Sequence, residues 1–266
     1  MPELSRCAVH TQTLKPWSLA ETCDALAAAG VGGVSVWRNH IEPVGIAEAA
    51  RIVKASGLKV PAVVRGGFFH EPDAVDVNKT CIDEAAALGA DMVVLVVGAV
   101  PGEPMEEQRK RVAHGIRQVV DHAEANNVQL AIEPLHPMYA ADKSCVNRLK
   151  DATDLAEQVA HPLVGVAVDA YHVWWDPDLK YELELCARFE RLQALHVCDW
   201  RVNTRDFLTD RGVIGEGCID VAGLRTLCED NGFDGLHEIE IFSAEGWAMP
   251  QDQWLKRVLD GYERHG

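Results

Sequence analysis

The sequence predicts an α/β protein, a single (β/α)8 TIM barrel formed by residues 1–266. Three observations predict this fold. The length is close to the roughly 250 residues that such barrels typically need. Short apolar runs alternate with amphipathic stretches along the whole chain, as parallel strands joined by helices do. The residues after the first apolar run, 10–13, contain no glycine, whereas a doubly wound open sheet usually has a Gly-rich phosphate turn there.

The first half of the chain begins this alternation. The run at 91–97 is continuously apolar, which is typical of a strand buried on both faces. Ser18 is a suitable N-cap for the first helix, and Gly57 and Gly89 stand where helices should end. We expect strands at 7–10, 31–37, 58–64, 91–97 and 128–133, and helices at 17–29, 45–56, 73–88 and 103–127.

The second half keeps the same order. Its apolar runs are again short and rich in valine, and Asp220 is a suitable cap for the helix that follows the longest loop. We expect strands at 164–169, 192–197 and 235–241, and helices at 150–160, 179–189, 220–231 and 251–264. Strands and helices in strict alternation, eight of each, favour a closed parallel barrel.

Composition narrows the classes of partner. The chain has 25 Lys and Arg against 41 Asp and Glu, a net charge of −16, and no basic run, so nucleic acid and anionic membranes are not expected partners. No window approaches 18 continuous apolar residues, so no membrane span is expected. The eight cysteines form no C-x-x-C pair, and no signal peptide is recognised, which together favour a reducing cytoplasm.

Four strands in a row end in a group that can bind a metal. Glu133, Asp169, His196 and Glu240 are separated by 36, 27 and 44 residues, each about one β/α unit. The carboxyl ends of barrel strands meet at one rim, where buried carboxylates would be costly and would repel one another without a cation. Three oxygen donors and one imidazole suit a divalent ion. We expect Mn²⁺, with Mg²⁺, Co²⁺ or Zn²⁺ as alternatives. Taken singly, each residue can instead pair with an arginine or cap a helix.

Other residues near this rim are candidates for substrate binding. We assign this role to His10, Trp37, Arg65, His172, Trp175 and Arg211. Arg65 and its neighbour Arg38 can bind a hydroxyl or an anion, or can neutralise the barrel carboxylates. Trp175 can stack on a sugar, pack within its loop or belong to a subunit interface, and a homodimer is possible. The loop that begins at Arg211 has three glycines whose N–H groups can bind an anion, although a plain turn is favoured.

The motifs AIEP, VDAYH, LHVCD and EIEIF, in this order and spacing, resemble the sugar phosphate isomerase/epimerase family with a xylose-isomerase-like barrel. That family includes ketose 3-epimerases, inosose dehydratase and 3-dehydroshikimate dehydratase. The resemblance implies one divalent metal held by Glu133, Asp169, His196 and Glu240. It also implies that both glutamates act as acid and base, and that His172 contacts substrate. Glu240 rather than Glu238 is taken as the ligand because the resemblance aligns on EIF.

These observations predict a divalent-metal-dependent isomerase or epimerase of a small sugar or keto-sugar. A metal-stabilised enediolate would form between Glu133 and Glu240, which come from strands three apart around the ring. The runner-up is a metal-dependent lyase or dehydratase that eliminates a group β to the carbonyl of a 3-keto sugar or cyclitol. A phosphodiesterase like the type IV AP endonucleases is disfavoured by the acidic charge and by the single ligand set. A non-catalytic binding protein is disfavoured by the complete ligand quartet. The sugar, its phosphorylation and the physiological metal are left open.

Overall fold

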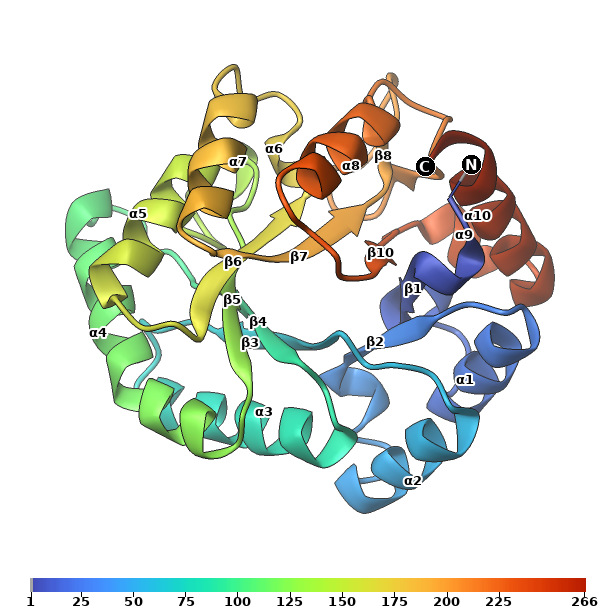
Figure 1. Cartoon of the computed structure of the whole chain (residues 1–266), viewed down its shortest axis with the longest axis horizontal. Helices are drawn as coiled ribbons and strands as arrows, with labels where there is room; N and C mark the ends of the chain where they lie inside the picture. Colours follow the sequence, from blue (N-terminus) through green and yellow to red (C-terminus); the bar gives the residue numbers. More distant parts are fainter. Residues whose placement is uncertain (1) are drawn as a thin grey trace.

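Eight parallel strands close into a barrel in the computed structural model, which describes residues 2–266 (Figure 1). Around the ring they follow the order β1-β10-β7-β6-β5-β4-β3-β2. The predicted fold class is therefore confirmed. The strands are β1 (Cys7–His10), β2 (Gly33–Trp37), β3 (Ala62–Gly67), β4 (Met92–Val96), β5 (Gln129–Ile132), β6 (Val164–Asp169), β7 (Leu192–Val197) and β10 (His237–Ile239).

Eight longer helices surround the barrel, at the positions that the sequence predicts. Ser18 and Glu21 form a capping box at the start of the first of them, and Gly57 and Gly89 end two others in the left-handed conformation. The helices are α1 (Leu19–Ala28), α2 (Ile46–Ser56), α3 (Ala74–Leu88), α4 (Met105–Ala125), α5 (Leu149–Val159), α7 (Leu179–Arg188), α8 (Val221–Asp230) and α10 (Gln251–His265).

Several short elements were not predicted. They are the helices α6 (Ala170–Val173) and α9 (Ala244–Ala248), the 3-10 turns Leu4–Arg6, Thr11–Leu14, Arg38–His40 and Pro137–Tyr139, and the two-residue strands β8 (Asp199–Trp200) and β9 (Arg211–Gly212). None is long enough to show a hydrophobic period. No helix among the described residues has the length and apolar character needed to cross a membrane.

The third strand lies later than predicted. Residues 58–64 were expected to form it, but β3 runs from Ala62 to Gly67. Pro61 has no backbone N–H for the sheet, so regular pairing begins after it. Arg65, which was expected to follow this strand, is therefore part of it.

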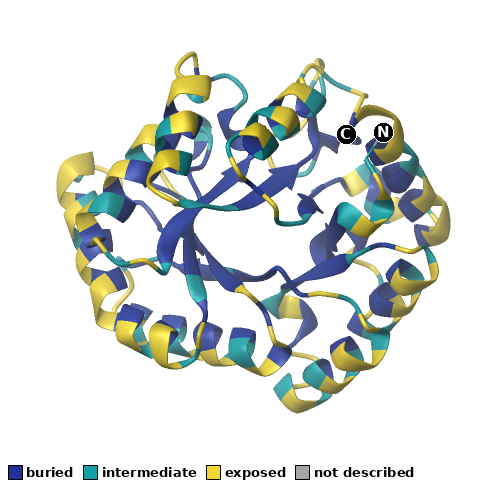
Figure 2. Cartoon of the chain, in the orientation of Figure 1, coloured by how far each residue is buried: buried dark blue, intermediate teal, exposed yellow. Residues whose placement is uncertain are grey.

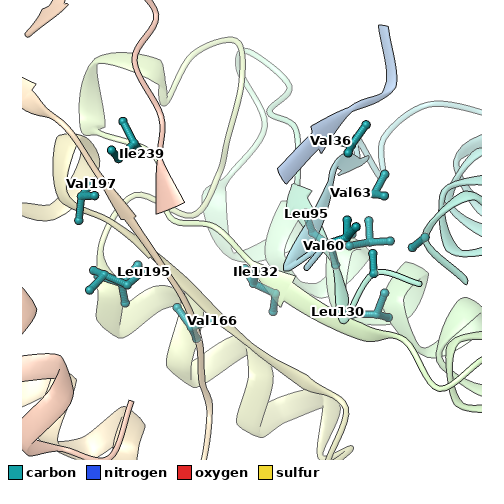
Figure 3. Packing of buried hydrophobic residues seen from close by; sticks show 14 of the residues in the cluster. Val36, Val60, Val63, Leu95, Leu130, Ile132, Val166, Leu195, Val197 and Ile239 are labelled. Atoms are coloured by element: carbon teal, nitrogen blue, oxygen red, sulfur yellow. The ribbon is translucent and has the colours of Figure 1, made fainter. Parts of the chain in front are cut away.

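Alternation along the strands separates an outer core from an inner one. Leu130, Ile132, Val166 and Leu195 face the helices and belong to the large apolar layer between barrel and helices (Figure 3). The outward faces of the helices are exposed, while the strands are buried (Figure 2). A second cluster fills the barrel interior with mostly small residues: Ala62, Val64, Met92, Val94, Ala131, Ala167 and Ala194.

This alternation sets the direction of the strand-end residues. Side chains two positions apart on a strand lie on the same face, so a residue two places after an inward alanine also points inward. Ala131 precedes Glu133 by two, Ala167 precedes Asp169, and Ala194 precedes His196. The backbone N–H of Glu133 donates to Leu95 O at 3.1 Å, and that of Glu240 donates to Val197 O at 3.2 Å, so both glutamates continue the parallel ladder. The four side chains therefore converge at the carboxyl mouth.

Candidate metal centre and active site

The four predicted ligands form one buried cluster. Glu133, Asp169, His196 and Glu240 each offer a donor atom, and these four atoms all lie within 4.8 Å of one another. Asp169 and His196 are direct register partners in β6 and β7, which explains why they meet. All four side chains are buried. The sequence therefore identified a set of residues that the fold brings together, and their role as ligands remains a prediction.

His196 is held by the first of the glutamates. Its Nδ1 lies 2.9 Å from Glu133 Oε1. Burial lowers the pKa of His196, but Glu133, Glu238 and Glu240 raise it more, to about 10. The imidazole therefore shares a proton with a carboxylate in this arrangement.

Arg211 connects the other two carboxylates. Its Nη1 lies 2.9 Å from both Asp169 Oδ2 and Glu240 Oε2, and its guanidinium stacks 4.5 Å from the centre of the Tyr171 ring. Burial raises the pKa of Asp169 to about 7, against the lowering effect of Arg211. Burial also raises the pKa of Glu240, but His10 and Arg211 bring it well below its usual range.

A small sheet that the sequence did not reveal positions Arg211. β9, which begins with Arg211, pairs antiparallel with β8, and the N–H of Arg211 donates to Phe242 O at 2.9 Å. The glycine-containing loop that follows does bind an anion, but it is the carboxylate of Asp199. The N–H groups of Gly215, Gly217 and Ile219 donate to it at 3.0, 2.8 and 2.9 Å. These N–H groups are thus taken by the protein itself.

A second layer of polar residues lies beneath the cluster. His10 lies between two carboxylates, with Nδ1 3.0 Å from Glu240 Oε1 and Nε2 3.4 Å from Glu238 Oε2. Ser35 Oγ donates to Glu238 Oε2 at 2.5 Å. Burial raises the pKa of Glu238, but His10, His196 and Ser35 lower it more. Glu238 thus belongs to a buried polar network below the cluster, as its position two residues before Glu240 suggests.

The donor set has the chemistry of a divalent metal site. Three carboxylates converge on one buried point, and the Arg211 guanidinium contacts only two of them. Oxygen donors with one imidazole are the ligands that Mn²⁺, Mg²⁺, Co²⁺ and Zn²⁺ accept. The residues present therefore fit such an ion.

His172 lies beside this cluster as a neutral imidazole. Its Nδ1 accepts the backbone N–H of His136 at 3.2 Å, and its Nε2 lies 3.3 Å from Arg211 Nη2 and 3.5 Å from Asp169 Oδ2. Burial and the neighbouring Arg211 hold the pKa of His172 well below its usual range. Both ring nitrogens of His172 thus face groups of the protein.

A cavity of about 230 Å³ opens onto the cluster. Glu133 and Glu240 line it, and so do four of the predicted substrate-binding residues: Trp37, Arg65, His172 and Arg211. Two predicted residues are not among its lining. His10 is fully buried behind Glu240, and Trp175 donates its Nε1–H to the backbone O of His172 at 2.8 Å. Trp175 thus supports the His172 segment from outside the cavity, where its large ring packs 5.6 Å from that of His136.

The cavity has walls that the sequence analysis missed. Phe68 and Phe242 add aromatic faces, and Lys143 adds a cation that lies over the Tyr139 ring at 4.2 Å. Phe242 stands two residues after Glu240. Because residues two apart on an extended chain share a face, this spacing could have placed Phe242 beside the cavity. Lys143 lies in a loop without regular spacing, and nothing in the sequence marked it.

The chain is similar to two named bacterial proteins. It is 22% identical over 234 residues to the inosose isomerase of Bacillus velezensis, with 84% of this chain and 81% of that protein covered. It is 27% identical over 223 residues to the probable endonuclease 4 of Oceanobacillus iheyensis, with 76% of this chain and 68% of that protein covered.

Solved structures resemble it over nearly their whole length. The crystal structure of protein SMc04130 from Sinorhizobium meliloti 1021 has a TM-score of 0.94 and 43% identity, covering 99% of both chains. The IOLI protein with a bound zinc atom has a TM-score of 0.82 and 18% identity, covering 98% of this chain and 99% of that one, a likeness of fold alone. The family model described as xylose isomerase-like TIM barrel matches residues 23–263. Because this match spans most of the sequence, the chain belongs to the xylose isomerase-like TIM barrel family.

Proposed function

We propose that this chain is a divalent-metal-dependent isomerase or epimerase of a small sugar or keto-sugar, with Glu133 and Glu240 as its acid–base pair. One observation carries the proposal. Three buried carboxylates and one imidazole offer donor atoms within 4.8 Å of one another, and they open onto a cavity of about 230 Å³. The sequence similarity to an inosose isomerase supports a carbohydrate substrate.

In this proposal Glu133, Asp169, His196 and Glu240 hold one divalent ion, with Mn²⁺ favoured. When bound, such an ion polarises a carbonyl and stabilises negative charge that develops beside it. The two glutamates follow strands that are three apart in the ring, so they approach a bound sugar from different sides. One removes a proton from carbon and the other returns one, which is the geometry that epimerisation needs. Arg211 holds Glu240, and the His172 ring forms part of the wall that the sugar contacts.

The cavity favours a small molecule over nucleic acid. A volume of about 230 Å³ suits a sugar and does not admit a duplex. The chain carries a net charge of −16, which opposes binding of a phosphate backbone. The likeness to probable endonuclease 4 proteins is therefore attributed to the shared barrel.

We also propose that residues 1–266 act as one barrel domain in the cytoplasm. All eight cysteines are free thiols, and seven of them are buried. A reducing compartment is where such thiols persist.

The test uses isotope exchange. The protein is stripped with EDTA, reloaded with Mn²⁺ and incubated with keto-sugars in D₂O, and the products are identified by NMR. We expect a stereoisomer or an aldose–ketose isomer with deuterium at the carbon that exchanges, formed only by the reloaded protein. Loss of water or of an alcohol would instead support the lyase alternative.

Glu182→Gln is the matched control for changes at the two glutamates, because Glu182 is also a buried glutamate but lies on α7 outside the barrel. Its exchange rate should equal that of the wild type. Exchange that is independent of the metal, or that persists in Glu133→Gln and Glu240→Gln, would contradict the proposed function.

A further inference from the structure

A second cavity adjoins the one above the cluster. It has a volume of about 490 Å³ and lies at the rim beside β2 and β3. Trp37, Arg65 and Phe68 line both cavities, so these side chains form the boundary between the two. A molecule whose reacting carbons lie near Glu133 and Glu240 therefore has Arg65 within the same cavity wall to meet its other end.

Arg65 has no acidic partner in this position. No carboxylate of residues 2–266 lies within 4.0 Å of its guanidinium, which stacks on the Phe68 ring at 4.1 Å and leaves its edge free to donate. Arg38 lines the same cavity, but its Nε lies 2.5 Å from Glu84 Oε2 and its charge is neutralised. Arg38 is thus paired with a helix glutamate rather than with a barrel carboxylate, and Arg65 remains a candidate for binding an anion.

The backbone beside Arg65 is held firmly. Asn78 Oδ1 accepts the N–H of Gly67 at 2.7 Å, and Asn78 Nδ2 donates to Gly67 O at 2.9 Å. Gly67 has a φ of +108°, and a Cβ there would lie 1.9 Å from Val96 O, so glycine lets β3 pack closely on β4. Arg65 is therefore presented from a fixed strand rather than from a mobile loop, which lowers the entropic cost of binding a ligand.

A second cation borders the same space. Lys15 lines the outer cavity, and its Nζ lies 4.7 Å from the centre of the Trp247 ring. Lys15 also has no carboxylate within 4.0 Å among the described residues. In a chain with 16 more acidic than basic side chains, two unpaired cations at one cavity make a local positive site.

We propose, on the basis of the proposed function, that the substrate carries an anionic group at the end remote from its reacting carbons, and that Arg65 binds this group in the outer cavity with Lys15 at its edge. A carboxylate and a phosphate ester share the required chemistry, because both accept paired hydrogen bonds from a guanidinium. The glycine-containing loop after β9 does not compete for this group, since its N–H groups already bind Asp199.

The test compares three ligands that differ only at carbon 6: D-fructose, D-fructuronate and D-fructose 6-phosphate. Their dissociation constants are measured by calorimetry with the EDTA-treated protein and with the Mn²⁺-loaded protein. We expect at least one anionic ligand to bind about tenfold more tightly than fructose. A hydrogen bond to a charged group typically contributes enough binding free energy for this difference. The preference should fall as ionic strength rises. The tighter of the two anionic ligands identifies carboxylate or phosphate as the group recognised.

Three variants assign the effect to Arg65. Arg65→Gln should remove most of the preference, and Arg65→Lys should keep part of it, since the charge remains. Arg38→Gln is the matched control, because this arginine faces the same cavity but is already paired, and it should keep the preference. Circular dichroism and the thermal midpoint establish that each variant is folded.

The inference and the proposed function fail in different ways. Equal affinities for the three ligands, no binding of either anionic ligand, or a preference that survives in folded Arg65→Gln would overturn the anion site. A preference that is present in EDTA-treated protein supports the anion site even if no keto-sugar is turned over. Turnover of neutral keto-sugars without any anion preference would overturn the anion site and leave the proposed function standing.

Discussion

The two halves of the barrel are built from the same β/α unit but end in different chemistry. β5, β6, β7 and β10 lead to Glu133, Asp169, His196 and Glu240, whereas β1, β2 and β3 bring His10, Trp37 and Arg65. In β5, β6 and β7 an inward alanine lies two residues before the strand-end group.

This difference separates two tasks. Small side chains under the acidic half let carboxylates and imidazole converge on one buried point. The rim of the other half presents an aromatic side chain and an unpaired cation to the cavities. We interpret the acidic half as the site of chemistry and the other half as the site that recognises the rest of the substrate.

The largest effect should come from removing a carboxylate in the acidic half. Glu133→Gln and Glu240→Gln should each lower turnover by about 10²- to 10⁴-fold, the usual contribution of a general acid or base. Trp37→Phe, in the other half, should change KM more than kcat. Steady-state kinetics on any keto-sugar that is turned over checks this. A glutamine variant with wild-type kcat would contradict the assignment of chemistry to the acidic half.

Arg211→Met should be the next largest change. It leaves Asp169 and Glu240 buried without their common cation, and removing one partner of a buried pair typically costs about 3–5 kcal/mol. Urea unfolding of EDTA-treated protein measures the loss, which saturating Mn²⁺ should reduce. Arg51→Met is the control, because the exposed Arg51–Glu48 pair should contribute less than about 1 kcal/mol. Equal losses in the two variants would show that Arg211 does not neutralise the cluster.

A smaller effect concerns pH. Burial raises the pKa of Asp169 from about 4 to about 7 in the folded protein, so between these values the folded chain holds a proton that the unfolded chain does not. This contribution to stability is present below pH 4 and is lost as the pH rises through 7. The unfolding free energy of the EDTA-treated wild type should therefore fall relative to that of Asp169→Asn over this window. Affinity for Mn²⁺ should rise over the same range, because the ion competes with the proton. If the unfolding free energies of the two proteins changed with pH in the same way, the raised pKa of Asp169 would be contradicted.

The smallest effect should come from Trp175→Phe. This change removes the hydrogen bond from Nε1 to His172 O but leaves an aromatic ring in place, so we expect about 1 kcal/mol of lost stability. Because Trp175 is not part of the cavity lining, sugar affinity should stay within about twofold of the wild-type value. A much larger change in affinity than in the thermal midpoint would place Trp175 in contact with substrate.

Regular patterns made the barrel and the acidic cluster predictable. Apolar runs of fixed spacing located the strands, and the parallel topology then brought their carboxyl ends to one mouth, so Glu133, Asp169, His196 and Glu240 could be selected from sequence. Spacing places Glu238 and Glu240 on one face, and Glu240 could be chosen only because the family resemblance aligns on EIF.

The parts that sequence did not reveal depend on tertiary contacts. Arg211 was placed in a loop, because a two-residue strand such as β9 has no period, and its pairing with β8 depends on Asp199 contacting distant N–H groups. Trp175 was assigned to the cavity because aromatic residues near a site often contact ligand, but its indole turns to the His172 backbone. The separation of Arg38 from Arg65 depends on Glu84, which lies on α3 and could not be paired with either from spacing alone.

The central claim is that four strand-end side chains bind one divalent ion. The most direct measurement is a titration of EDTA-treated protein with Mn²⁺, followed by electron paramagnetic resonance of the free ion, with Asp169→Asn and Glu182→Gln measured alongside. We expect one tight site per chain in the wild type and in Glu182→Gln, and its loss in folded Asp169→Asn. A wild-type protein that binds no ion, or an Asp169→Asn variant that binds it as tightly, would contradict the account.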